Sequence, residues 1–198
     1  MRHSLIRLLP LAATVALTGC ISFGAKPPPS LLTLDATAQP QPGRTQTSAD
    51  ARSIVVQTPV VPTSLATARV PVQATPGTIA YIKDAQWSEP PARLFARLLS
   101  DTLTAQANIV VLSPAQSVSD PSGNLGGELR TFGVDATAQQ AVVVYDASLT
   151  RVNATAVEKR RFEARVPVAA IDATSAGSAL NQAANQVAGE VATWVAGR

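Results

Sequence analysis

The chain has a single thiol, Cys20, and a single imidazole, His3, and both stand near its amino terminus. Cys20 ends the tetrapeptide Leu17-Thr18-Gly19-Cys20, which closes an apolar stretch that follows the basic residues Arg2 and Arg7. A basic start, about ten apolar residues and then small residues are typical of a secretory signal, because a membrane-spanning helix needs about 20 apolar residues. We therefore expect this segment to be removed rather than kept in the membrane.

The tetrapeptide resembles the lipobox of bacterial lipoprotein signal peptides, in which the cysteine is acylated and then becomes the new amino terminus. The resemblance implies that residues 1–19 are a signal peptide and that Cys20 carries a diacylglycerol group and an N-acyl chain. Each buried methylene contributes about 0.8 kcal/mol, so several acyl chains would hold the protein firmly on a membrane. An incidental buried thiol is the less favoured alternative for the only cysteine of the chain.

Loss of the signal would leave little chemistry in the mature chain. His3 departs with residues 1–19 and acylation consumes Cys20, so neither an imidazole nor a free thiol remains. This excludes nucleophile pairs of the Ser-His-Asp and Cys-His types, the common zinc ligand sets and an intrachain disulfide. The carboxylates are scattered singly rather than paired on a motif. We therefore expect a non-enzymatic protein without catalytic residues, cofactors or bound metal.

The charge balance argues against a nucleic-acid partner. The full chain has 16 basic and 13 acidic residues and a net charge of +3, and without Arg2 and Arg7 the 16 become 14 and the net charge becomes +1. The one basic run, Lys159-Arg160-Arg161, lies in a stretch in which charged and apolar residues alternate. Such alternation is typical of a half-exposed strand rather than of a nucleic-acid interface.

Three parts are expected along the chain: the signal peptide 1–19, a tether 20–30 that starts with the lipidated cysteine, and a single domain 31–198. The tether contains Pro27-Pro28-Pro29, and consecutive prolines favour a stiff, extended chain that would hold the domain away from the membrane. Removal of 19 of the 198 residues leaves 179, which is enough for one domain with its own core.

Apolar and β-branched runs predict a mixed, largely antiparallel sheet. Strands are expected at 31–34, 53–62, 69–74, 78–83, 109–112, 127–135, 141–151 and 157–168. Pro76 and Gly77 stand at the central positions of a turn between two of these strands and predict a type II turn. The polar segment 39–50 and the segment 113–127, with its glycine-rich run 123–127, are expected to be loops.

Two long helices are predicted to pack on the sheet. The first follows Trp87, with Ser88 as its N-cap and two prolines in its first turn, and it ends near Asn108. The second covers 172–195, and its apolar face is rich in alanine, which suits close packing. The fold class is therefore expected to be an α/β (α+β) sandwich, with one sheet packed by two long helices.

Trp87 has two interpretations. A tryptophan directly before a helix could be exposed for contact with a partner, and this makes Trp87 a candidate partner contact. A hydrophobic plug over the core is the more common role of a residue of this size and position, and it is the interpretation that we favour.

These features, in this order, resemble the ABC-type transport auxiliary lipoprotein family. The resemblance rests on residues 31–34 after the anchor, on Tyr-x5-Trp-x2-Pro-Pro and a Leu-rich helix within 81–103, on the strand 127–135, and on the terminal helix ending Trp194-Val195. It implies a mixed α/β sandwich that faces the periplasm and works with MCE-domain proteins and an ABC transporter. Such systems move phospholipids or related lipids across the Gram-negative cell envelope. Cys20 is the only functional residue that the resemblance carries over.

Two functional classes remain open. The first is an auxiliary subunit of a lipid-transport system, and the second is a structural or secretion-pore-associated outer-membrane lipoprotein. The first is preferred, because no long amphipathic hairpin is present that could add strands to a pore. Ile21 follows the anchor where an aspartate would indicate retention at the inner membrane, so the outer membrane is expected. Whether the protein forms a homo-oligomer is left open.

Overall fold

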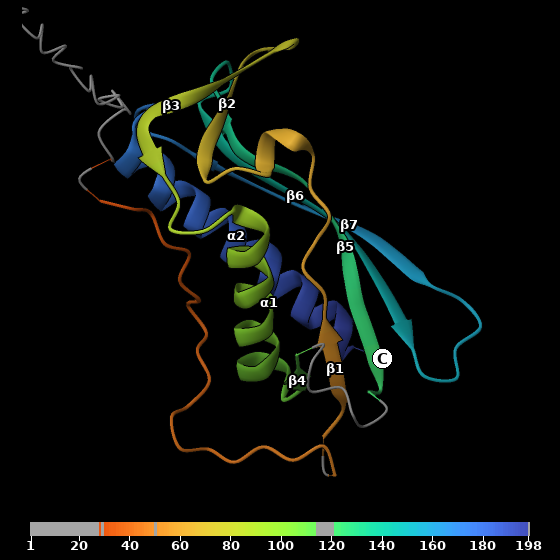
Figure 1. The fold of residues 1–198 in the computed structure, drawn as a ribbon. Helices are drawn as coiled ribbons and strands as arrows, with labels where there is room; N and C mark the ends of the chain where they lie inside the picture. Colours follow the sequence, from red (N-terminus) through yellow and green to blue (C-terminus); the bar gives the residue numbers. More distant parts are fainter. Residues whose placement is uncertain (1–27, 29, 50, 114–120, 198) are drawn as a thin grey trace, which may run out of the picture.

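Two long helices cover one face of a mixed sheet, and the orange segment that precedes β1 runs beside these helices (Figure 1). The structure is a computed structural model that describes residues 28, 30–49, 51–113 and 121–197. The predicted signal peptide, Cys20 and most of the predicted tether therefore lie outside the described residues. The predicted fold class, a sheet of the α+β type packed by two helices, is confirmed.

The sheet is organised around its longest strand, β5. The strands in chain order are β1 (Ser53–Val56), β2 (Arg69–Thr75), β3 (Thr78–Gln86), β4 (Val110–Leu112), β5 (Gly123–Asp135), β6 (Gln140–Arg151) and β7 (Glu158–Pro167). On one side, β5 pairs antiparallel with β6, and β6 pairs antiparallel with β7. On its other side, β5 pairs in parallel with β1 and, further along, with β2. β4 extends the sheet beyond β1, and β3 extends it beyond β2.

The alternation of side chains along β7 decides which face of the sheet packs against the helices. Phe162, Ala164 and Val166 belong to the core, whereas the charged residues between them are exposed. A strand with this period has one face on the core and one in water. The alternation in the sequence therefore predicted the burial correctly. We call the sheet face opposite the helices the outer face.

The first helix, α1 (Pro91–Ala107), packs through the apolar face that the sequence predicted, but it begins differently. Its N-cap is Pro90, and no side chain caps it, so the prediction of Ser88 as the N-cap is wrong. The backbone N–H of Ser88 donates instead to the carbonyl of Leu32, at 2.9 Å, and Ser88 lies in a bend before the helix. Asn108 ends the helix in the left-handed conformation, with a φ of 50°, as is usual for such a cap.

The second helix, α2 (Ala173–Ala196), begins with a side-chain cap: Asp172 accepts a hydrogen bond from the Ser175 N–H at 2.8 Å. Its buried face consists mainly of alanine and valine, together with Gly177 and Leu180. Small side chains allow α2 to lie close to the sheet and to α1, so the predicted role of the alanine-rich face is confirmed.

The glycine-rich run 123–127 is not a loop, as predicted, but the first part of β5. Within this run Leu125 is fully buried, and the backbone pairs with β1 on one side and β6 on the other. Gly127 has a φ of 143°, and a Cβ atom there would collide with the Asp146 carbonyl oxygen. Glycine is therefore required by close strand packing rather than by a turn.

Three smaller predictions also need correction. The hairpin between β2 and β3 forms as predicted, but Gly77 does not have the positive φ that a type II turn requires. The strand predicted over 53–62 ends at Val56, and beyond it Val60 makes only an isolated bridge. The strand predicted over 31–34 is reduced to one bridge, from Leu32 to Trp87. Residues 39–49, by contrast, have no helix or strand, as expected.

Candidate functional site

The sequence points to the attachment of the domain to its anchor as a functional region. Cys20 lies outside the described residues, so the structure neither places its thiol nor shows its modification. What it does show is how the chain that follows is fastened to the domain. We call residues 31–37 the strap; they run from the predicted tether to the polar segment that follows (Figure 1).

Backbone hydrogen bonds join the strap to the chain between β3 and α1. The Leu32 N–H donates to the Gln86 carbonyl at 2.8 Å, and the Leu32 carbonyl accepts from the Ser88 N–H at 2.9 Å. The strap thus makes the same kind of contact as an additional parallel strand, limited to one residue. These two bonds connect the strap to the segment that positions the start of α1.

The side-chain amide of Asn185 on α2 holds the second half of the strap, and the amide of Asn181, one turn earlier, contacts the Thr33 carbonyl. The Asn185 Oδ1 accepts hydrogen bonds from the Thr37 N–H at 2.8 Å and from its hydroxyl at 2.9 Å, and the Asn185 Nδ2 donates to the Asp35 carbonyl at 2.9 Å. Between these polar contacts, Leu34 and Ala36 belong to the hydrophobic core. The strap is therefore fastened both to α2 and to the core.

Gly177 makes room for the first part of the strap. A Cβ atom at this position would lie 2.7 Å from the Cδ2 of Leu32. That separation is shorter than a normal contact between carbon atoms, which is about 3.5–4.0 Å. The glycine, in the second turn of α2, allows the leucine side chain to pack directly on the helix backbone.

Trp87 is buried, with 1% of its surface exposed. Its ring meets Phe132 edge to face at 5.4 Å, and its backbone N–H donates to the Ala68 carbonyl at 2.7 Å. This burial favours the interpretation of Trp87 as a plug over the core, and it leaves the side chain no surface with which to contact a partner. The indole nitrogen has no hydrogen-bond partner among the described residues.

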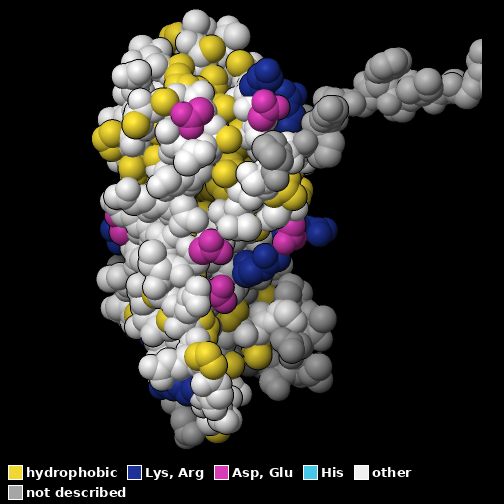
Figure 2. Space-filling view, turned by 90° about the vertical axis from the view of Figure 1, so that its left-hand side faces the viewer, with side chains coloured by type: hydrophobic (Ala, Val, Ile, Leu, Met, Phe, Trp, Pro, Cys, Tyr) yellow, Lys and Arg dark blue, Asp and Glu magenta, His cyan; other side chains and the backbone are white. Residues whose placement is uncertain are grey.

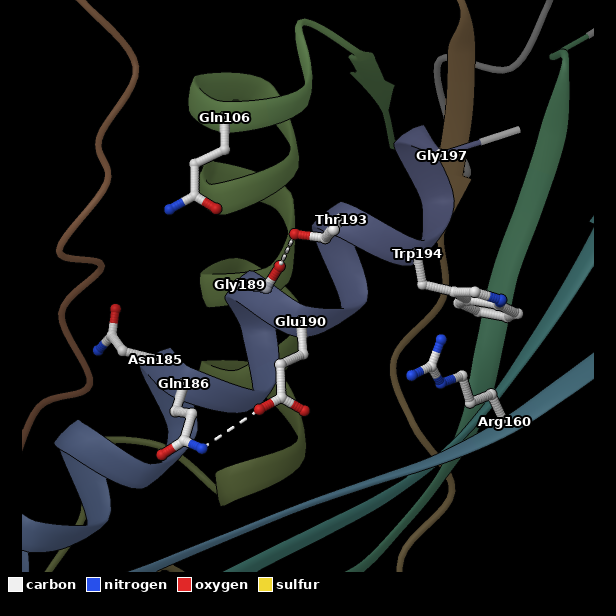
Figure 3. Close-up of a pocket in the computed structure, with 9 residues that line it drawn as sticks. All are labelled: Gln106, Arg160, Asn185, Gln186, Gly189, Glu190, Thr193, Trp194 and Gly197. Carbon is white, nitrogen blue, oxygen red and sulfur yellow. Dashed lines mark hydrogen bonds between the residues drawn. The ribbon is translucent and has the colours of Figure 1, made fainter.

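An open groove of about 670 Å³ runs beside the carboxyl-terminal half of α2 (Figure 3). We call it the Trp194 groove; it is lined by Gln106 of α1, Arg160 of β7, and Asn185, Gln186, Gly189, Glu190, Thr193, Trp194 and Gly197. The half-buried Trp194 packs against Phe162, with ring centres 5.6 Å apart. Arg160 lies over the same phenyl ring, with its guanidinium carbon 5.0 Å from the ring centre.

The Trp194 groove combines one cation that is unpaired among the described residues with an aromatic side chain. Its walls are mostly uncharged, and Glu190 accepts a hydrogen bond from Gln186 at 3.2 Å. Arg160 makes no ion pair with any described residue, so its charge is available to a ligand or partner. An unpaired guanidinium beside a half-exposed indole is a combination that recurs at protein interfaces.

The outer face of the sheet has a network of ion pairs centred on Asp146. Arg161 donates two hydrogen bonds to its carboxylate, at 2.6 and 2.7 Å, and Arg130 lies 3.5 Å away. The hydrogen bond from Arg161 is the main reason why the pKa of Asp146 is below its usual range. A carboxylate held ionised in this way is a poor proton carrier near neutral pH.

Two other titrating groups have altered environments without forming a reactive pair. Burial raises the pKa of Tyr145, whose hydroxyl donates to the Gly126 carbonyl at 2.6 Å. Burial also raises the pKa of Asp101, and nearby Arg97 partly opposes this shift. In the described part of the chain, no three Asp, Glu, His or Cys side chains lie close enough together to hold a metal ion. Neither α1 nor α2 is long and apolar enough to cross a membrane.

The sequence pattern indicates neither the strap contacts nor the Trp194 groove. It places Asn185 on the solvent face of α2, although an asparagine within an alanine-rich helix, four residues after Asn181, could have indicated a polar clamp. It places Arg160 on a solvated strand face. The proximity of Arg160 to Trp194 depends on how β7 lies beside α2, and no local pattern encodes that arrangement.

The chain matches the model of a described protein family. The model of the ABC-type transport auxiliary lipoprotein component matches residues 32–192. The matched segment begins within the strap and includes Trp87 and most of the Trp194 groove. No curated protein matches the chain.

Solved structures share the fold at low sequence identity. Protein XCC0632 from Xanthomonas campestris is 20% identical, with a TM-score of 0.70 over 84% of this chain and 94% of that chain. An uncharacterized protein is 19% identical, with a TM-score of 0.65 over 73% of this chain and 92% of that one. A hypothetical protein from Chlamydia trachomatis is 8% identical, with a TM-score of 0.50 over 75% of this chain and 99% of that chain. At these identities the likeness shows the fold alone.

Proposed function

Because the chain belongs to the family of ABC-type transport auxiliary lipoprotein components, we propose that it is a non-enzymatic subunit of a system that moves phospholipids or related lipids across the cell envelope. The observation that carries this proposal is the family match over residues 32–192. The proposed partners are an MCE-domain protein and the subunits of an ABC transporter.

In this proposal the chain has three parts. Residues 1–19 are removed, the acyl chains on Cys20 are embedded in the outer membrane, and residues 20–30 connect Cys20 to the domain 31–198. The hydrogen bonds of the strap support this arrangement, because they would transmit the hold of the anchor to α2 and the core. The absence of an aspartate after Cys20 supports the outer membrane.

The Trp194 groove is the surface that we propose for the protein partner. It is concave, it presents a half-buried indole, and Arg160 has no acidic partner among the described residues. The expected ligand is a segment of the partner with at least one carboxylate for Arg160 and an apolar side chain for Trp194. The tight Arg161–Asp146 pair on the outer face offers no such free charge.

Affinity purification from crosslinked envelopes tests the function. Wild type should recover an MCE-domain protein and ABC subunits, and Cys20→Ala should recover less of both. Mass spectrometry of the purified chain should show cleavage before Cys20 and acylation of that residue. Recovery of only outer-membrane assembly or secretion proteins would contradict the transport role and support a structural one.

A pair of charge reversals tests the groove in the same assay. Arg160→Glu should lower the recovery of the MCE-domain protein, because it places a negative charge beside Trp194. Arg93→Glu is the matched control, because Arg93 is also exposed and lies on α1 outside the groove. Equal recovery with the two variants would argue against the groove as the docking surface.

A further inference from the structure

We propose that one end of the domain rests on the lipid surface, through the exposed side chains of Leu31, Ile79 and Ile171. This inference rests on the proposed acylation of Cys20. We call this region the tether end. It consists of the start of the strap, the β2–β3 turn, the β5–β6 turn and the segment between β7 and α2.

Hydrogen bonds and contacts bring these four segments to one end of the molecule. Ile79 pairs with Gln73, whose carbonyl accepts from the Ala136 N–H in the β5–β6 turn at 3.0 Å. At the other side of this turn, the Gln139 carbonyl accepts from the Val168 N–H at 2.9 Å, directly before the segment that carries Ile171. That segment leads into α2, where Gly177 contacts Leu32 of the strap.

The tether end exposes large aliphatic side chains. Among the described residues, the exposed large hydrophobic side chains are Leu31 at 50%, Ile79 at 50%, Ile171 at 41%, Val60 at 70%, Val152 at 44% and Val157 at 55%. The three that are larger than valine all lie at the tether end. In Figure 2 hydrophobic side chains gather at the upper end of the molecule, where β2 and β3 stand in Figure 1.

Small uncharged residues precede two of these side chains in the chain, although Asp172 directly follows Ile171. Ile79 follows the turn Thr75-Pro76-Gly77-Thr78, and Ile171 follows Ala169 and Ala170, all of which are exposed. Val152 and Val157 lie at the opposite end, in the β6–β7 turn, next to Arg151 and Glu158. Single exposed apolar residues are common on soluble proteins, so it is the grouping at the point of attachment that indicates a contact.

The length of the tether makes this end the one that meets the membrane. Eleven peptide bonds separate Cys20 from Leu31, and at about 3.6 Å per residue they reach at most about 40 Å. A domain of about 170 residues has a radius of gyration of about 15 Å and is therefore about 40 Å across. The opposite end could reach the membrane only with the tether almost fully extended, which chain entropy opposes. The tether end reaches it without stretching.

Charged residues near this surface limit the depth of the contact. Lys83 and Asp84 are exposed in the irregular part of β3, and Asp172 caps α2. Such residues remain at the level of the lipid headgroups, while aliphatic side chains reach the boundary with the acyl chains. The contact is therefore interfacial, and it should form on zwitterionic as well as anionic lipid. In this orientation the Trp194 groove, at the other end of α2, faces away from the membrane.

Fluorescent labels at single cysteines test the orientation on the acylated protein. Acylation consumes Cys20, so the mature chain has no other thiol to compete for the label. Ile79→Cys and Ile171→Cys place the label at the tether end, and Val157→Cys is the matched control at the opposite end. Each protein is labelled with an environment-sensitive dye and reconstituted in phosphatidylethanolamine–phosphatidylglycerol vesicles that contain brominated acyl chains. All three labelled positions are exposed, so circular dichroism of each variant should match wild type.

We expect the labels at 79 and 171 to shift to shorter wavelength and to show at least about threefold more bromine quenching than the label at 157. Equal quenching at the three positions, or quenching only at 157, would overturn the orientation. Absence of quenching at all three positions would overturn lipid contact itself. Mass spectrometry of the same samples separates the two proposals, because an unmodified Cys20 contradicts the anchor, whereas acylated protein with unquenched labels contradicts only the contact.

Discussion

Replacing Asn185 with alanine should release the strap from α2 without unfolding the rest of the domain. The substitution removes the two hydrogen bonds that the side-chain oxygen accepts from Thr37 and the one that its amide donates to the Asp35 carbonyl. Both strap residues are exposed, so water can replace the lost partners. The net contribution of each bond is therefore near the lower part of the usual range, about 0.5–1 kcal/mol.

The three bonds together should stabilise the closed strap by about 1.5–3 kcal/mol. Since every 1.4 kcal/mol is a factor of ten, opening of the strap should become about 10- to 100-fold more frequent in Asn185→Ala. Local opening of this kind is measured by hydrogen exchange under native conditions. The peptide that covers the strap should exchange faster by this factor, whereas the peptides of β5 and β6 should keep the protection of wild type.

Gln186→Ala is the control, because Gln186 lies next to Asn185 on α2 and its amide reaches only Glu190. It should leave exchange of the strap unchanged. If Asn185→Ala left strap exchange at the wild-type rate, the hydrogen bonds would not be what holds the strap. If both variants accelerated exchange equally, a general loosening of α2 would explain the result instead.

Three substitutions in the sheet have outcomes that the structure also determines. Gly127→Ala should lower the free energy of unfolding by about 2–4 kcal/mol, measured by urea denaturation, because its φ is 143° and the new Cβ would collide with the Asp146 carbonyl. Tyr145→Phe should cost about 1–2 kcal/mol in the same assay, because it leaves the Gly126 carbonyl without its 2.6 Å hydrogen bond. Asp146→Asn should be less stable than wild type at neutral pH by a small amount, and the difference should vanish in acid. The Arg161 hydrogen bond lowers the pKa of Asp146 in the folded protein below its value in the unfolded chain. The ionised carboxylate therefore stabilises the fold above the unfolded-state pKa, and this stabilisation is lost as the pH falls through the folded-state pKa.

Each of these outcomes has a matched comparison. Gly77→Ala introduces a Cβ that meets nothing within 4 Å, so stability close to wild type is expected, and a loss as large as that of Gly127→Ala would refute the steric argument. Tyr81→Phe removes a longer hydroxyl contact, 3.4 Å to the Ser64 carbonyl, and should cost less than Tyr145→Phe. A stability difference for Asp146→Asn that stayed constant from neutral pH to strong acid would show that the stabilisation by the Arg161–Asp146 pair does not depend on the charge of Asp146.

Features that depend on local period and on composition can be read from the chain alone. The helical spacing of leucines gave the buried face of α1, and strict alternation in β7 separated core residues from charged ones. The single thiol and the single imidazole, both near the amino terminus, limit the chemistry through composition alone. The inferences from period succeed because a helix turn or a strand pleat places neighbouring residues on the same face whatever the rest of the chain does.

Features that depend on distant segments follow from the way the chain folds in three dimensions. Glycines at 123–127 usually predict a loop, but pairing with β1 and β6 on both sides makes them a strand. Ser88 could have capped α1, but its N–H is bonded to Leu32, 56 residues earlier in the chain. The strap clamp at Asn185 and the placement of Arg160 beside Trp194 likewise join residues far apart in sequence. Such contacts follow from the order of strands and the position of α2, and the period of a single element contains no information about them.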